Sequence, residues 1–473
     1  MVYGSFLGVY FTPVAGGSDS SGYLNAAQLL SRGQLTAPMR DYSGLTANST
    51  TQFQPLGFIA EPDRQRLVPT YPLGLPAHLA IASAFFGWSI GPLIVGIGAT
   101  LAAIVLMYAI ARELTIAWPL AAAGAVILGV FPVTIFIAIQ PLSDVLATTW
   151  VLAAIFAALR ARSSQSWALT TGVALSIAIF VRPTNVLILP AIVVVIGIGW
   201  RPLTAAALGG LPGALLLLAS NAHLFGSPWR MGYGSIFEAF DFAYLKPTLL
   251  HFGKWLGLLL PGLGLFFGVI TFGLTRTAMR TRLALALWFL IPVIFYAYYE
   301  VSGQTWWCLR FILPAVPALI LSAILALDYF LTPYLRSLRI ASALLAIWSI
   351  GLSWFWTRDF HTLLSRTYEQ AYADLGQWSH DHLPANTVLI TNNDSGALYY
   401  YTPFPILRWD QMNAAEFAQH AALLMRAGRP LHLITTEAEE NHVLTQRIPA
   451  RWEKITNVAQ RSIWRYEGPT ATP

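Results

Sequence analysis

The chain has 473 residues, of which 56% are hydrophobic and only 11% are charged, and this excludes an ordinary soluble globular protein, where about 25% of residues are charged. The net charge of +6 comes mostly from arginines beside apolar runs, so it indicates membrane topology rather than nucleic-acid binding. The single cysteine, Cys308, excludes an intrachain disulfide and a cysteine-based metal site.

Repeated apolar runs predict a polytopic α-helical membrane protein, because about 20 apolar residues cross a bilayer. We expect about 11 spans on this criterion, the first of them short and without the basic start of a signal peptide. Whether the natural chain starts upstream stays open. The run 74–87 is too short to cross and is interpreted as an interfacial or re-entrant helix. The expected spans are 1–14, 90–111, 118–138, 143–160, 166–181, 184–200, 203–221, 250–274, 283–299, 311–329 and 340–357.

Basic residues gather in alternate gaps between these spans, and this bias predicts the orientation. The positive-inside rule places the arginine-rich gaps in the cytoplasm. The loop 15–73 and the region after 358 then lie outside. The cytoplasmic arginines of this assignment are Arg112, Arg160, Arg162, Arg201, Arg276, Arg280, Arg282, Arg336 and Arg339.

The region 359–473 has a higher charge density and shorter apolar runs than the rest of the chain. Strands are predicted at 386–391 and 429–436, and amphipathic helices at 368–383 and 414–428. This alternation is typical of an α/β fold. We therefore expect a transmembrane domain over 1–358 and a small soluble extracytoplasmic α/β domain over 359–473.

Asp19 is the first candidate for chemistry, in the segment "SDSSGYLNAAQLL" (18–30). One interpretation is structural: Asp19 or Ser20 caps a helix running from Ser21 to Ser31. The other is a general base held at the membrane surface, because this helix is amphipathic. Tyr23, on the same helix, is a candidate substrate contact. The other acids of this loop, Asp41, Glu61 and Asp63, are interpreted as solvated charges.

Charged residues at the outer ends of later spans form a second group of candidates. Asp144 either caps its helix or faces a substrate. Arg182 and Arg310 are candidate phosphate ligands, because guanidinium binds phosphate oxygens with fork geometry. Their alternative role is an ion pair with Asp144 or Glu300, and Glu300 is itself a candidate substrate contact.

Two further residues, His78 and Trp307, are candidate substrate contacts that also have plausible structural roles. His78 lies in "YPLGLPAHLA" (71–80), where a structural histidine is the favoured interpretation. Trp307 is either a substrate contact or a member of the interfacial aromatic belt.

The motifs in their order resemble the GT-C superfamily of membrane glycosyltransferases, most closely its bacterial protein-mannosyltransferase-like and aminoarabinose-transferase-like branch. After the Asp19 segment, the resemblance rests on "YPLGLPAHLAIASAFFG" (71–87), "PLSDVLATTWVLAA" (141–154), "VRPTNVLILP" (181–190) and "WWCLRFILPAVPAL" (306–319). It covers about 1–358.

The resemblance implies a polyprenyl-phosphate-linked sugar as donor and a multi-pass protein of the inner or plasma membrane that works in the cell envelope. It makes Asp19 the catalytic acid of the first outer loop, and it maps Asp144 and Arg310 onto family positions. Ser21 stands where a second acid would complete a DxD pair, so the requirement for a divalent cation stays open.

The predicted function is transfer of a sugar to an acceptor hydroxyl on the outer face of the membrane, with inversion. The acceptor is a lipid, a protein or a polysaccharide, and the pattern does not choose among them. The alternatives are a transporter or lipid-linked sugar flippase, and a non-catalytic scaffold whose C-terminal region binds cell-wall polymer.

Overall fold

The computed structural model describes residues 2–42, 45, 51–61, 65–161, 163–234, 236–268 and 278–469. Contacts divide the chain into two units. We call Met1–Phe11 with Ser89–Ser365 the helical unit, and Thr12–Trp88 with Arg366–Pro473 the sheet unit.

The helical unit contains six helices in the described residues that are long and apolar enough to cross a membrane. They are α4 (Gly91–Glu113), α7 (Ser143–Arg160), α10 (Trp200–Phe225), α14 (Met279–Ala297), the continuous segment Trp306–Leu331, formed by η7 (Trp306–Ala315) and α15 (Val316–Leu331), and α16 (Leu335–Asp359). The chain is therefore a multi-pass helical membrane protein. A seventh crossing is the bent pair α5 (Trp118–Val130) and α6 (Pro132–Ala138), with 56° between the two helices.

The remaining expected spans are shorter or broken in the described residues, which is why this count is below the expected number. The shorter elements of the helical unit are α1 (Val2–Tyr10), α8 (Gln165–Val181), η3 (Pro183–Ile188), α9 (Leu189–Ile196), α11 (Ile236–Ala239), η4 (Phe242–Tyr244), α12 (Leu245–Leu259), α13 (Leu263–Gly268), η6 (Glu300–Gly303) and η8 (Thr362–Leu364). Proline at the start of η3 and again in α9 ends the regular α-helical ladder after α8.

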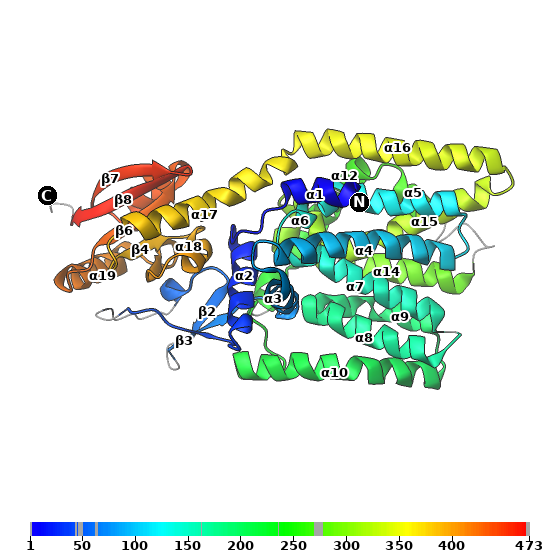
Figure 1. Ribbon diagram of the computed structural model, residues 1–473, viewed down its shortest axis with the longest axis horizontal. Helices are drawn as coiled ribbons and strands as arrows, with labels where there is room; N and C mark the ends of the chain where they lie inside the picture. Colours follow the sequence, from blue (N-terminus) through cyan, green and yellow to red (C-terminus); the bar gives the residue numbers. More distant parts are fainter. Residues whose placement is uncertain are drawn as a thin grey trace. The chain divides into compact units, whose positions relative to one another are not determined.

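Close packing of α8 against α10 depends on two glycines, Gly172 and Gly209, which have no side chain at the contact. A Cβ atom on Gly172 would lie 1.8 Å from the carbonyl oxygen of Ala206, and one on Gly209 would lie 2.1 Å from that of Leu169. Only glycine permits this approach, which is the usual way for membrane helices to pack tightly. Figure 1 shows the resulting row of α4, α7, α8 and α10, each helix in contact with the next.

The bend between α5 and α6 is held by hydroxyl groups from other helices. Pro132 starts α6, so the carbonyl groups at the end of α5 lose their helical partners. The Tyr3 hydroxyl donates to the Gly129 carbonyl, and the Ser353 hydroxyl donates to the Val130 carbonyl. The break is therefore satisfied within the protein, as a break at membrane depth requires.

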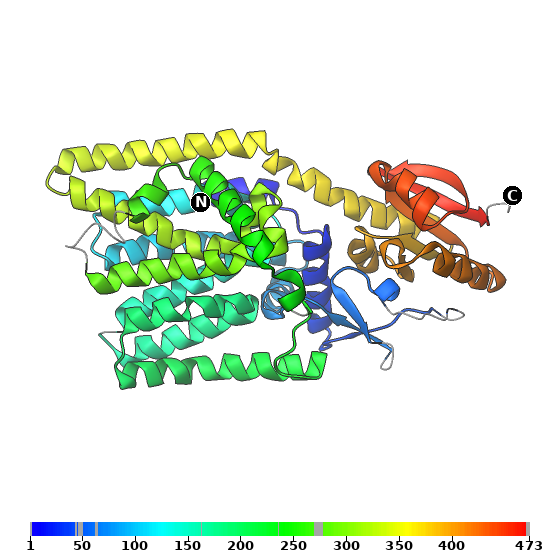
Figure 2. The same cartoon turned by 180° about the vertical axis from the view of Figure 1, so that it is seen from behind.

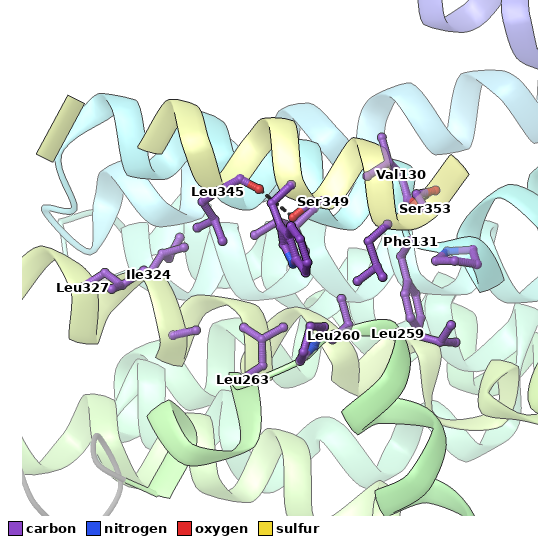
Figure 3. A pocket seen from close by; sticks show the side chains of 16 residues that line it. Val130, Phe131, Leu259, Leu260, Leu263, Ile324, Leu327, Leu345, Ser349 and Ser353 are labelled. Carbon is purple, nitrogen blue, oxygen red and sulfur yellow. Dashed lines mark hydrogen bonds between the residues drawn. The ribbon is translucent and has the colours of Figure 1, made fainter. Parts of the chain in front are cut away.

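An apolar cavity lies beside this bend (Figure 3). Phe131, Leu260, Ile324 and Leu345 are among its lining residues, and Ser353 lies at its edge. None of the charged residues singled out in the sequence lines it.

The sheet unit combines the loop region Thr12–Trp88 with the C-terminal region Arg366–Pro473. The loop contributes α2 (Ser18–Ser31), η1 (Thr51–Phe53), α3 (Gly74–Phe86) and the antiparallel sheet β1-β3-β2, formed by β1 (Ala37–Pro38), β2 (Phe58–Glu61) and β3 (Arg66–Pro69). Its register pairs Ile59 with Val68.

The C-terminal region forms a five-stranded mixed sheet in the order β5-β4-β6-β8-β7, seen from behind in Figure 2. Its elements are α17 (Ser365–His382), β4 (Val388–Thr391), α18 (Ser395–Tyr401), β5 (Ile406–Arg408), η9 (Trp409–Gln411), α19 (Ala414–Arg426), β6 (Leu431–Thr436), α20 (Glu437–His442), η10 (Val443–Arg447), β7 (Arg451–Val458) and β8 (Arg461–Gly468). β4 pairs in parallel with β5 and β6, whereas β8 is antiparallel to its neighbours. The two strands and two helices predicted here are thus confirmed.

The loop region shares a core with the C-terminal sheet. Phe53 is buried in one cluster with Val388, Ile390 and Leu433. The Arg40 guanidinium lies 3.8 Å from the centre of the Tyr399 ring and donates to the Tyr399 carbonyl. This grouping differs from the boundary expected at 358, because buried residues of the loop pack against residues of the C-terminal sheet.

Candidate active site

Asp19 lies in the first turn of α2, which begins at Ser18 rather than at Ser21. The N-cap residue is Gly17, and the helix has no side-chain cap bond. The interpretation of Asp19 or Ser20 as the cap is therefore wrong. The Asp19 carboxylate instead accepts a hydrogen bond from the Tyr71 hydroxyl at 2.7 Å. A hydrogen bond to a charged group contributes about 1.5–3 kcal/mol, so this contact fixes the orientation of the carboxylate.

Tyr71 was not predicted as a site residue from the sequence, although its hydroxyl directly contacts the candidate base. Burial, followed by the negative charge of Asp19, raises the pKa of Tyr71 well above its ordinary value. The phenol therefore stays protonated and serves as a donor at neutral pH. Tyr23 is buried, and its ring centre lies 4.8 Å from that of Tyr71. Its visible role in the structure is thus to support Tyr71.

A close approach of backbones places Tyr71 against α2. A Cβ atom on Gly22 would lie 2.3 Å from the Tyr71 ring and 3.2 Å from the Cα atom of Gly57. Gly57 itself has a φ of +88°, which other residues rarely adopt. The two glycines therefore create the space in which the tyrosine reaches Asp19.

Glu369 is a second carboxyl group near Asp19 that the sequence did not reveal. It lies on α17, and its Oε2 atom accepts a hydrogen bond from the Gly17 amide at 3.2 Å. Burial raises the pKa of Glu369, the bond from Gly17 lowers it, and the charge of Asp19 raises it further, for a net increase. No sequence signal connects Glu369 with Asp19, because 350 residues separate them in the chain.

The structure brings Asp144 and Arg182 together as an ion pair in the helical unit. Asp144 is 2% exposed in the first turn of α7, whose N-cap is Leu142 without a side-chain bond. Arg182 follows the last residue of α8. The ion-pair alternative is thus confirmed for Arg182, and the helix-cap interpretation of Asp144 is wrong.

Arg182 and Arg310 flank one aromatic ring, that of Phe311. Their guanidinium carbons lie 5.7 Å and 5.2 Å from its centre. Arg310 also lies over the ring of Trp307, at 4.9 Å. Tyr296 stacks on Phe311 with 5.4 Å between ring centres. The two predicted phosphate ligands therefore belong to one cluster, which places two positive charges beside apolar walls.

The other predicted residues have separate surroundings. His78 Nδ1 lies 2.7 Å from the Gly74 carbonyl oxygen, one turn earlier in α3, as a structural histidine would. Glu300 is exposed at the start of η6 and forms no ion pair with Arg182 or Arg310 among the described residues. Glu61 pairs with Arg66 at 2.8 Å, a local loop contact. Asp63 lies outside the described residues.

No metal centre can be assigned from side chains in the described parts of the chain. Nowhere in these parts do three His, Cys, Asp or Glu side chains come close enough together to hold a metal ion.

Comparison with known proteins gives a likeness of fold. No family model matches the chain, and no curated protein is similar to it in sequence. The crystal structure of ArnT from Cupriavidus metallidurans bound to undecaprenyl phosphate is similar with a TM-score of 0.60, 11% identity, and coverage of 98% of this chain and 97% of that one. The apo form of the same protein gives a TM-score of 0.55 and 15% identity, with 97% and 95% covered. The chain thus has the membrane fold of ArnT over nearly its whole length.

Proposed function

We propose that the protein is a glycosyltransferase that moves a sugar from a polyprenyl-phosphate donor to an acceptor hydroxyl. The observation that carries this proposal is the Asp19 carboxylate, held by the Tyr71 hydroxyl in the first turn of α2. A fixed carboxylate beside a protonated phenol is suited to receive a proton. The shared fold with a protein bound to undecaprenyl phosphate supports the class of donor.

In this mechanism the acceptor hydroxyl attacks the anomeric carbon of the sugar, and Asp19 takes the hydroxyl proton. A bond forms between the acceptor oxygen and the anomeric carbon as the bond to the phosphate oxygen breaks. The polyprenyl phosphate leaves with the electron pair, and it is already a good leaving group without an acid. One displacement inverts the anomeric configuration.

Arg182 and Arg310 are proposed to bind the departing phosphate. Two guanidinium groups on either side of Phe311 offer fixed positive charge in surroundings of low dielectric. The ion pair with Asp144 holds Arg182 in place. Because guanidinium carries five N–H donors, pairing with a carboxylate and binding a phosphate are compatible roles.

The proposed location is the inner or plasma membrane, with the site and the region 359–473 outside. Arg160 lies in the last turn of α7, whereas Asp144 lies in its first turn. Eighteen residues separate these ends by roughly 25 Å. Arg112 lies in the last turn of α4. Arginines at the ends of helices opposite to the acid support the orientation that the positive-inside rule predicts.

We further propose about eleven membrane crossings, completed by shorter apolar helices. α8 supports this, because it packs along both α7 and α10, which are long enough to cross. The functional division we propose is a catalytic region over 1–358 and a soluble α/β domain over 359–473.

The test is transfer of radiolabelled sugar from polyprenyl-phosphate hexoses and pentoses in membranes containing the full chain. We expect Asp19→Asn to lower transfer by about 10²- to 10⁴-fold, the range of a general base. The control is Asp41→Asn, whose side chain is 72% exposed and whose transfer should match the wild type. Unchanged transfer in Asp19→Asn would refute the role of Asp19.

The anomeric configuration of the product gives a second, independent check. Retention would contradict the single displacement. If wild-type membranes transfer no sugar but move a labelled lipid-linked sugar between leaflets, the protein is a flippase and the proposal fails.

A further inference from the structure

The buried carboxyl group of Glu369 has no part in the mechanism above, yet it contacts the chain just before the proposed base. Its Oε2 atom accepts from the Gly17 amide at 3.2 Å. Gly17 is the N-cap residue of α2, and Asp19 is the second residue of the helix. The contact is therefore two residues from the catalytic carboxylate.

The hydrogen bond from the Gly17 amide to Glu369 replaces a capping bond that no side chain of α2 provides. The first N–H groups of a helix lack partners within the helix. In a capping box, a Glu or Gln at the third helical position accepts from the amide of the N-cap residue. In α2 that third position is Ser20, and the cap is a glycine without a side chain. Glu369 supplies the missing acceptor from another helix.

The local shape of the chain is fitted to this carboxylate. A Cβ atom on Gly16 would lie 1.6 Å from Glu369 Oε2, so the carboxylate occupies space that only glycine leaves open. Next to it, the Tyr401 hydroxyl accepts from the Ala15 amide at 2.9 Å. Residues 15–17 are thus held at two successive points from α17 and α18.

The two supporting helices are themselves packed against each other. A Cβ atom on Gly376 of α17 would lie 2.5 Å from the Cβ atom of Tyr401 on α18. Displacement of one helix would therefore displace the other. This makes the support for residues 15–17 rigid, which a positioned general base needs, because misplacement of about 1 Å can reduce a rate 10²-fold.

We propose that Glu369 is a positioning residue, which caps α2 from α17 and thereby fixes the turn that carries Asp19. The inference rests on the proposed function of Asp19. A negative charge at the start of a helix is also favourable with the helix dipole. The C-terminal region thus has a definite task, the placement of the base.

The test compares two variants in the full chain reconstituted in lipid nanodiscs. Glu369→Gln keeps an oxygen acceptor on a side chain of the same length, whereas Glu369→Ala removes it. We expect Glu369→Ala to lower kcat about 10-fold with little change in KM for the donor, and Glu369→Gln to keep most of the wild-type kcat. The matched control is Asp381→Ala, an exposed acid on the same helix that bonds only to Gln377 among the described residues.

Hydrogen exchange of the amides of residues 15–24 gives a readout that needs no transfer activity. It should be faster in Glu369→Ala than in Glu369→Gln, the control or the wild type. Unchanged exchange in Glu369→Ala would overturn the inference. A Glu369→Gln variant as inactive as Glu369→Ala would also overturn it, since the carboxyl group would then act in proton transfer. If Asp19→Asn stays active, the proposed role of Asp19 fails, while the exchange result still decides whether Glu369 caps α2.

Discussion

Replacement of Gly22 by alanine tests whether the contact between α2 and Tyr71 positions the proposed base. Alanine is the better helix former by about 1 kcal/mol, so helix propensity alone predicts a more stable protein. The structure predicts the opposite. The added Cβ atom would lie 2.3 Å and 2.5 Å from two carbons of the Tyr71 ring, and 3.2 Å from the Cα atom of Gly57.

The sizes of the opposing free-energy terms decide whether Gly22→Ala stabilises or destabilises the protein. Forcing an extra methyl group into a well-packed site costs about 1–3 kcal/mol. The ring cannot retreat without drawing its hydroxyl away from Asp19, which loses a charge-assisted bond of about 1.5–3 kcal/mol. After subtraction of the gain in propensity, we expect a net loss of about 1.5–5 kcal/mol.

The assay is a thermal melt of the purified full chain together with sugar transfer in membranes. We expect Gly22→Ala to melt several degrees lower and to transfer sugar more slowly, because both the packing and the orientation of Asp19 change. Gly351→Ala is the matched control, since a Cβ atom there meets no atom within 4 Å. A Gly22→Ala variant that melts at or above the wild-type temperature and transfers sugar normally would refute the reasoning.

Three further predictions concern groups elsewhere in the chain. Arg182→Gln leaves the Asp144 carboxylate buried without its ion pair, so we expect a loss of about 3–5 kcal/mol, measured by thermal melting and partly restored by adding Asp144→Asn. Burial, followed by the charge of Arg465, lowers the pKa of His432 to about 4. The folded protein then binds fewer protons than the unfolded chain, so stability should fall as the pH drops from about 6.5 to about 4, and His432→Phe should flatten that part of a melt-versus-pH curve. Ser353→Ala removes the donor to the bend between α5 and α6, and a loss of about 1–3 kcal/mol in the same melt is expected; no change would show that another group satisfies the bend.

The sequence was sufficient for the membrane character of the chain and for the α/β pattern of its C-terminal region. Both follow from local signals, namely the length of apolar runs and the periodicity of apolar residues. Breaks such as the proline at the start of η3 are also visible in the sequence, but their effect on the length of a regular helix depends on neighbouring segments. That is why the expected spans exceed the long helices of the structure.

Asp19 could be found from the sequence because it is the only acid in the segment "SDSSGYLNAAQLL" (18–30). Its partners could not be found in this way. Tyr71 lies 52 residues away and Glu369 lies 350 residues away, so both depend on tertiary packing. The cap was misassigned for a related reason. Side-chain preference favours Asp or Ser as the N-cap, but the helix begins at Ser18 after Gly17, and the acceptor for the Gly17 amide comes from Glu369 in a distant part of the chain.

The sequence offered two interpretations for Arg182, as a phosphate ligand or as an ion-pair partner. The two roles are compatible. A mobile arginine loses side-chain entropy when it binds a phosphate, whereas one already held by Asp144 has lost most of that freedom beforehand. The same reasoning applies to Asp19, whose rotamer is fixed by Tyr71 before any substrate arrives. In both cases a contact typical of a structural role also prepares a reactive group, so finding such a contact does not argue against catalysis. What distinguishes the roles is the response to substitution: a structural partner changes the melting temperature, and a group acting on the substrate changes kcat at constant stability.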